Sequence, residues 1–176
     1  MFHTRIDFSE IKPEALTKDN YSPTFDCSYE DTMGLNEFYH KEALNYQKER
    51  CGKTFIFFYD DKTIGFITMS MNAIERNQIK EKNGKLPFRL REYPAVLIGR
   101  IAVDNKWRSM HIGEHICKWA IGYSIYLSDL IGCRYIILQT DEIHKGFYEK
   151  LKFKLYLVEL NEDKLLDYWY YHKLDI

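Results

Sequence analysis

The chain of 176 residues lacks the features that define several large classes of protein. Its four cysteines show no CxxC spacing and no cysteine–histidine cluster of the zinc-finger type. No apolar run approaches the roughly 18 residues that cross a membrane, and the N-terminal MFHTRIDFSE has no signal-peptide core. Internal repeats and low-complexity linkers are also absent. We therefore expect a cytoplasmic protein that does not act at a membrane, with Cys117 and Cys133 as buried, reduced thiols.

A strong charge of either sign is missing too, because 25 Lys and Arg oppose 26 Asp and Glu for a net charge of −1. This balance excludes a protein coated in basic charge for nucleic acid, but it is compatible with a local basic patch. Hydrophobic residues make up 45% of the chain, which is enough for the core of one domain. Residues 73–92 are polar and basic, with six Lys or Arg against three Glu between 74 and 92. We predict a short helix and a loop there.

Hydrophobic periodicity predicts alternating strands and helices through the middle of the chain. Residues 1–24 read as irregular, and 25–28 as a short strand or an anchoring turn. The predicted helices cover 34–49, about 112–132, and 142–151. The predicted strands cover 54–59, 63–71, 95–104, 134–139, 153–159 and 168–174. This pattern is typical of a mixed α/β (α+β) sheet.

The stretch from Asp104 to Glu114 links the buried strand 95–104 to the helix that follows it. A helix N-terminus has unpaired backbone N–H groups, and its dipole favours an anion. Arg108 opens the loop, and Gly113 permits the backbone to approach a phosphate closely. The stretch therefore predicts a site for a pyrophosphate.

The same residues allow another interpretation, because His111-Ile112-Gly113-Glu114-His115 spells H-x-x-E-H, the signature of an inverted zinc protease. That chemistry needs both histidines on one helix face and a third ligand. Here His111 lies at the entrance of the helix, and no distal carboxylate stands out. We therefore expect no metal site, and we expect His115 on the surface or partly packed. His3, His40, His144 and His172 show no partner in the sequence.

At Arg108-Ser109-Met110-His111-Ile112-Gly113 the chain resembles the GNAT superfamily of acetyltransferases, whose acetyl-CoA signature is Arg/Gln-x-x-Gly-x-Gly/Ala. The resemblance implies a single domain over 1–176 with a core at about 25–174. It also implies a mixed sheet of about six to seven strands, flanked by helices and splayed at the acetyl-CoA site. The acetyl-CoA contacts that it implies are Ile101, Ala102, Val103, Arg108, Ser109, Met110, His111, Ile112, Gly113, Glu114 and Tyr148.

One residue departs from this signature, because His111 replaces its first glycine. A non-glycine residue with positive φ costs about 1–2 kcal/mol. Histidine is among the residue types enriched there, so we expect the loop to close.

The segment Gly146–Phe153 resembles the GNAT helix that carries Phe-Tyr before the next strand. Its tyrosine corresponds to Tyr148, which the resemblance makes the acid that protonates the leaving thiolate. The implied reaction is direct transfer of an acetyl group to a primary amine. Many GNAT enzymes place a glutamate base on the central strand, where this chain has Arg100. The missing base favours an α-amine, whose reference pKa of about 7.7–8.0 lies below the 10.4 of lysine.

Phe25–Ser28, LNEF, EALNYQKE, KTFIF and GRIAVDNKWR also resemble the GNAT toxins of toxin–antitoxin pairs. In that subgroup the acceptor is the α-amine of aminoacyl-tRNA, and the basic segment 76–91 is suited to meet its phosphates. The sequence leaves open a small-molecule or protein N-acetyltransferase, and a degenerate domain that binds CoA without catalysis. It also leaves open an antitoxin partner and a homodimer, because the aromatic segment Asp167–Leu174 is either a core strand or one that completes a dimer sheet.

Overall fold

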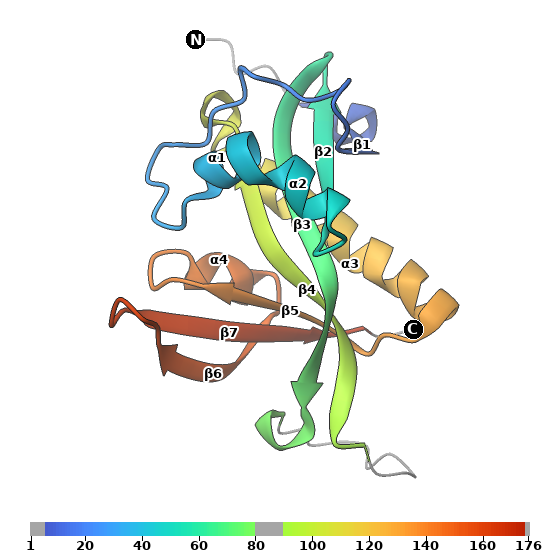
Figure 1. The fold of residues 1–176 in the computed structure, drawn as a ribbon, viewed down its shortest axis with the longest axis vertical. Helices are drawn as coiled ribbons and strands as arrows, with labels where there is room; N and C mark the ends of the chain where they lie inside the picture. The colour runs from blue at the N-terminus through green and yellow to red at the C-terminus, as the bar shows by residue number, and fades with distance from the viewer. Residues whose placement is uncertain (1–5, 80–89, 175–176) are drawn as a thin grey trace. The chain divides into compact units, whose positions relative to one another are not determined.

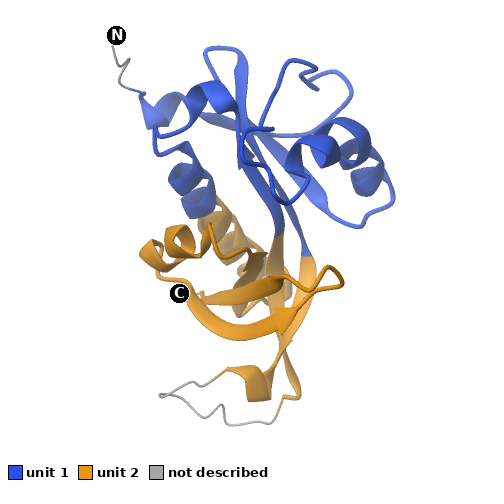
Figure 2. Cartoon of the chain, turned by 90° about the vertical axis from the view of Figure 1, so that its left-hand side faces the viewer, with its two compact units in different colours: residues 1–70, 99–119 blue, residues 71–98, 120–176 orange. Residues whose placement is uncertain are grey.

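The computed structural model describes residues 6–79 and 90–174. The described chain divides into two compact units, coloured blue and orange in Figure 2. Unit 1 comprises Met1–Ser70 and Gly99–Trp119, and unit 2 comprises Met71–Ile98 and Ala120–Ile176. The organisation of the chain as a single domain stays a prediction.

Seven strands form one mixed sheet (Figure 1) in the order β1-β2-β3-β4-β5-β7-β6. The strands are β1 Lys12–Ala15, β2 Lys53–Tyr59, β3 Lys62–Glu75, β4 Glu92–Val103, β5 Tyr135–Thr140, β6 Lys154–Leu160 and β7 Leu166–Lys173. The helices are η1 Phe8–Glu10, α1 Leu35–Glu37, η2 Phe38–Glu42, α2 Ala43–Lys48, η3 Arg76–Gln78, η4 Asn105–Trp107, α3 Ile112–Ile131 and α4 Lys145–Lys150. The predicted fold class is confirmed.

The central strand β4 separates from its parallel neighbour β5 part-way along its length. The parallel pairing runs from Ala95 opposite Tyr135 to Ile98 opposite Leu138. Gly99–Val103 have no β5 partner among the described residues. The predicted splay is therefore present, and it leaves one edge of the last five residues of β4 without a ladder.

Two predicted elements were wrong. Residues 1–24 contain the strand β1, which pairs with β2 at the edge of the sheet. Pro13 lies within it, and an edge strand tolerates proline because the missing N–H is not needed by a neighbour. Residues 73–92 begin as strand, because β3 continues to Glu75, and the predicted short helix follows only as the three-residue η3. The rest of that predicted loop, residues 80–89, lies outside the described residues.

The core of unit 1 joins α1, η2 and α2 to one face of β2, β3 and β4. Phe38, Tyr39 and Ala43 pack there with Phe66 and Ala102, and all five are buried. Residues 25–28 form no strand, and Phe25 and Cys27 hold them in this cluster; with the turn at residues 29–30 they make up the anchoring turn, residues 25–30. The Trp119 ring of α3 contacts Phe55 and Phe57, which alternate along β2 with Ile56.

The core of unit 2 is aromatic. Tyr135 of β5 packs edge-to-face on Tyr93 of β4 and Tyr171 of β7, and all three are buried. β7 pairs with β5 on one side and β6 on the other, so its hydrogen-bonding edges are used within its own chain. The aromatic C-terminal segment is therefore a core strand, and a homodimer stays a prediction.

The four cysteines are free thiols, and Cys117 and Cys133 are buried as predicted. Burial raises the pKa of Cys117 to about 12, so this thiol is protonated and behaves as an apolar side chain. No helix among the described residues is both long and apolar enough to cross a membrane.

Candidate active site

The loop between β4 and α3 has an uncommon backbone. Ser109 and His111 adopt left-handed conformations, with φ of 63° and 60°. His111 therefore takes the conformation for which the glycine of the signature is suited. Each left-handed non-glycine residue costs about 1–2 kcal/mol, so the surrounding structure must hold the loop in this shape.

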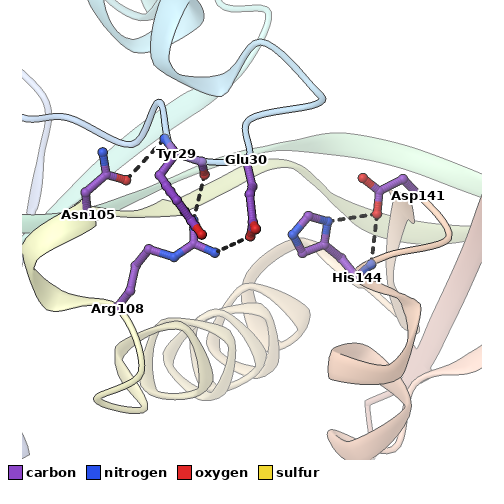
Figure 3. A network of polar contacts seen from close by, with 6 residues as sticks. All are labelled: Tyr29, Glu30, Asn105, Arg108, Asp141 and His144. Carbon is purple, nitrogen blue, oxygen red and sulfur yellow. Dashed lines mark hydrogen bonds and ion pairs between the residues drawn. The ribbon is translucent and has the colours of Figure 1, made fainter.

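Asp104 is the anchor of this loop. Its buried carboxylate accepts hydrogen bonds from the backbone N–H of Lys106 at 2.9 Å and of Asp26 at 3.0 Å. Its own N–H donates to the carbonyl of Ile64 on β3 at 2.9 Å. Asn105 extends the anchor, because its Oδ1 accepts from the N–H of Tyr29 at 3.3 Å (Figure 3). The loop is thus bonded both to the sheet and to the anchoring turn.

Arg108, a predicted phosphate ligand, is engaged by the same turn (Figure 3). Its Nη1 donates to the Tyr29 carbonyl at 2.7 Å, and its Nη2 lies 3.4 Å from Glu30 Oε2. The guanidinium also lies over the Tyr29 ring, 4.8 Å from the ring centroid. Arg108 therefore has an internal carboxylate as its present anionic partner.

The first turn of α3 carries a second small network. His111 Nδ1 lies 3.3 Å from Glu114 Oε2, and Lys118 Nζ donates to Glu114 Oε1 at 2.6 Å. The hydrogen bond from Lys118, helped by His111, lowers the pKa of Glu114. The His111 side chain is 78% exposed, so it reaches solvent at the helix entrance.

The predicted contacts from Ile101 to Glu114 all belong to unit 1. Ile112 is buried and fixes the start of α3. Ser109 is exposed, and Met110 and Gly113 are partly buried. Ala102 is buried, and the neighbouring Ile101 and Val103 are partly exposed on the splayed part of β4.

Gly65 of β3 allows β4 and α3 to approach each other closely at this point. A Cβ atom there would lie 2.6 Å from Ile116 Cδ1 and 2.8 Å from the Ala102 carbonyl oxygen. Both distances are shorter than real Cβ contacts allow. A side chain at Gly65 would therefore displace the strand and the helix that frame the loop.

Histidine and carboxylate side chains of the loop do not form a metal centre. In the described chain, no group of three or more His, Cys, Asp or Glu side chains is placed to hold a metal ion. His115 is partly buried and stacks on Phe8, 5.3 Å between ring centroids. Burial, helped by the nearby Lys118, lowers its pKa.

Tyr148 lies in unit 2, on the short helix α4, and is only 7% exposed. Its ring meets Phe147 and Phe153 edge-to-face. Strand β7 holds the helix, because buried Tyr170 donates its hydroxyl to Glu149 at 2.7 Å and Tyr168 bonds Glu142 before the helix starts. The Tyr148 ring is therefore set by packing on a fixed helix.

One polar pair in unit 2 was missed from the sequence. His144 Nδ1 lies 2.8 Å from Asp141 Oδ1, and the same oxygen accepts the His144 N–H at 2.8 Å (Figure 3). Nε2 of His144 has no hydrogen-bond partner among residues 6–79 and 90–174. His144 precedes Tyr148 by four residues, one helical turn. The Asp-x-x-His spacing at a helix start was the available signal.

His40 also gains partners that the sequence did not reveal. Its Nδ1 lies 2.7 Å from the Tyr21 hydroxyl and its Nε2 lies 2.8 Å from the Phe25 carbonyl. The carbonyl only accepts, so Nε2 carries the proton and Nδ1 accepts from Tyr21. His40 therefore fixes the anchoring turn to η2. His172 has weaker contacts with the Lys152 carbonyl and the Phe153 ring, and His3 lies outside the described residues.

The family model described as "Acetyltransferase (GNAT) family" matches residues 15–153 of the chain. A "tRNA-acetylating toxin" of Mycobacterium tuberculosis (strain ATCC 25618 / H37Rv) is 26% identical over 128 residues. That alignment covers 69% of this chain and 72% of the relative.

Two solved structures share the fold. "AtaT complexed with acetyl-methionyl-tRNAfMet" matches with a TM-score of 0.75 at 19% identity, covering 90% of this chain and 93% of that one. "Crystal structure of AtaTR bound with AcCoA" matches with a TM-score of 0.71 at 19% identity, covering 94% and 95%.

Proposed function

The chain belongs to the acetyltransferase (GNAT) family, and we propose that it moves an acetyl group from acetyl-CoA to the α-amine of an aminoacyl-tRNA. The proposed use of acetyl-CoA as the acetyl donor rests on the strained loop between β4 and α3. Two left-handed residues, Ser109 and His111, lead directly into the twenty-residue helix α3. Strained backbone conformations of this kind cluster at active sites and ligand-binding sites. The backbone N–H groups at the start of a helix are suited to bind a pyrophosphate.

The acetyl-CoA site that we propose comprises the loop residues Arg108 to Glu114 and the splayed strand Ile101–Val103. Backbone N–H groups of the strand are suited to bind the pantetheine amides and the thioester oxygen, as the family resemblance implies. Arg108 would exchange its contact with Glu30 for a phosphate.

The chemistry that we propose is direct attack. The amine nitrogen bonds to the thioester carbonyl carbon, the carbon–sulfur bond breaks, and the thiolate takes a proton from Tyr148. The nitrogen must lose a proton in the same event. His144 is our candidate for that acceptor, because Asp141 fixes Nδ1 as the protonated nitrogen and leaves the lone pair on Nε2.

The proposal that the acceptor is an aminoacyl-tRNA rests on three observations of different kinds. β4 has Arg100 and no carboxylate after Glu92, which favours an amine that is already largely neutral. The segment 74–92 carries six basic residues against three acidic ones. A relative 26% identical to this chain is named a tRNA-acetylating toxin, and a structure of the same fold is described in complex with acetyl-methionyl-tRNA. Binding of an antitoxin is a further proposal from the same resemblance, since one solved neighbour is bound to the C-terminus of one.

Calorimetry tests acetyl-CoA as the proposed donor, and we expect saturable binding together with a higher melting temperature. No stabilisation at cofactor concentrations far above micromolar would refute it. Turnover of the wild type is then compared on aminoacyl-tRNA, free amino-acid esters and N-terminal peptides. Transfer to esters or peptides alone would support the alternative acceptors, and binding without transfer would indicate a degenerate domain.

Variants separate the two proton roles. Tyr148→Phe should slow turnover by at least about 100-fold with little change in acetyl-CoA affinity. Asp141→Asn and His144→Gln should slow turnover, and His144→Gln should also change its pH profile, because it removes the group that accepts the proton of the amine. Unchanged turnover in Tyr148→Phe, or an unchanged pH profile in His144→Gln, would remove that residue from its role.

A further inference from the structure

Arg100 of β4 is a cation without an anionic partner among residues 6–79 and 90–174. Its guanidinium lies over the Phe38 ring, 4.0 Å from the centroid, and near the Tyr46 ring at 5.3 Å. The side chain is partly buried, and it makes no hydrogen bond or ion pair with any residue that the structure describes. A partly buried cation usually has a carboxylate or another polar partner, so this arrangement calls for an explanation.

The other arginines near aromatic rings do have polar partners. Arg108 of the same unit bonds a carbonyl and a carboxylate. Arg134 of unit 2 lies 5.5 and 5.6 Å from the Tyr93 and Tyr135 centroids, and its Nε donates to the Tyr135 hydroxyl at 3.2 Å. Stacking therefore does not by itself leave an arginine without hydrogen bonds in this chain.

The donors of Arg100 are accessible. In the described chain, the fully enclosed side-chain polar atoms without a partner are Thr63 Oγ1 and Ser124 Oγ, and no nitrogen of Arg100 is among them. Stacking occupies a face of the guanidinium and leaves its N–H groups pointing outward in the plane. Those groups match two oxygens of a phosphate or a carboxylate.

The rings that hold Arg100 are themselves fixed. Phe38 is 3% exposed and lies in the core of unit 1, edge-to-face with Tyr46 at 5.6 Å. It begins the π-helical segment η2, and π-bulges in helices occur frequently at functional sites. Arg100 shares a strand face with Ala102, which packs against the same helices, because alternate residues face the same side.

We propose that Arg100 binds a phosphate group of the acceptor, and this inference rests on the proposed function. In an aminoacyl-tRNA the amino-acid carboxyl is esterified, so the phosphates are the negative charges near the reactive end. Arg100 immediately precedes Ile101–Val103, the strand segment proposed to hold the thioester. A phosphate on Arg100 would therefore place the aminoacyl end beside that segment.

The test uses the full chain and an acceptor-stem minihelix with an amide-linked 3′ amino acid, which cannot hydrolyse. Fluorescence anisotropy measures its affinity for the wild type, Arg100→Gln, Arg100→Lys and the control Arg134→Gln. We expect at least about a tenfold loss in Arg100→Gln, because a two-pronged charge-assisted contact disappears, and a smaller loss in Arg100→Lys. The salt dependence of log K should fall in slope by about 1 in Arg100→Gln. The control removes the same charge from another stacked arginine and should bind as the wild type does.

Acetyl-transfer kinetics are measured with an aminoacyl minihelix and with an amino-acid methyl ester. The comparison distinguishes a lost phosphate contact from a general disturbance of the structure. In Arg100→Gln we expect kcat/KM for the minihelix to fall at least about tenfold more than that for the ester, which has no phosphate. Equal losses on the two acceptors, or an unchanged salt slope, would overturn the proposal, as would a wild type that does not bind the minihelix. Acetyl-CoA binding and melting temperature are measured for every variant. A wild type without acetyl-CoA binding refutes the proposed function itself, whereas normal acetyl-CoA binding and equal minihelix affinity in Arg100→Gln refute only the role of Arg100.

Discussion

The two groups of polar contacts in Figure 3 join residues that lie at very different separations along the sequence. In the loop after β4, side chains of Asp104, Asn105 and Arg108 bond residues 76 to 79 positions away. At the start of α4, His144 bonds Asp141, only three positions away. The shape of the loop therefore depends on contacts with the anchoring turn, whereas the Asp141–His144 pair can form with the local helix start. A distant contact makes the loop responsive to changes elsewhere in unit 1.

The largest expected effect comes from breaking the loop anchor. Asp104→Ala removes the acceptor of two backbone N–H groups, and hydrogen bonds to a charged group are worth about 1.5–3 kcal/mol each. We expect the free energy of unfolding to fall by about 3 kcal/mol in urea denaturation. Asp141→Asn, which disturbs the local pair, should cost less than about 1 kcal/mol. Equal losses would contradict the contrast between the two groups of contacts.

A smaller effect is expected where β7 holds α4. Burial, helped by Glu149, raises the pKa of Tyr170, so its hydroxyl stays protonated and donates at all ordinary pH values. Tyr170→Phe should cost about 1 kcal/mol of unfolding free energy and raise hydrogen exchange in α4. Tyr126→Phe, an exposed tyrosine on α3, is the matched control and should be neutral. If exchange in α4 did not change, the helix would be held by packing alone.

The sequence separation of these contacts also explains which features of the fold and the site were predictable from the sequence. The β4–loop–α3 unit followed from local periodicity, because it is encoded within about 25 neighbouring residues, whereas the splay and the role of Tyr148 were implied by the family resemblance. The contact of Arg108 with Tyr29 and Glu30 was not predictable, since no local pattern links residues 79 and 78 positions apart. β1 was missed because Pro13 signals a break unless the strand is known to lie at an edge. Asp141–His144 was within reach, and its spacing was overlooked.

The contact between Glu30 and Arg108 offers a finer test of the loop. If a phosphate replaces Glu30, Glu30→Gln should tighten acetyl-CoA binding by about 1.4- to fivefold, since exposed ion pairs are worth about 0.2–1 kcal/mol. Glu37→Gln removes an exposed pair with Lys41 from the same unit and should leave the affinity unchanged. Titration calorimetry measures both. Weaker binding in Glu30→Gln would instead show that Glu30 positions Arg108 for the cofactor.

The smallest effect concerns His115, which links α3 to Phe8 near the loop. Burial, helped by Lys118, lowers its folded-state pKa, so below pH 6.5, the ordinary value, the unfolded chain takes up this proton before the folded chain does. Stability should therefore fall as the pH drops through that window, and His115→Asn should lessen the fall. Because His115 is only partly buried, we expect a change below about 2 °C in melting temperature between pH 7.5 and 5. His111→Asn is the control, since it removes an exposed histidine from the same helix start and keeps a residue type that tolerates a positive φ. An equal response in both variants would mean that the packing on Phe8 does not govern the protonation of His115.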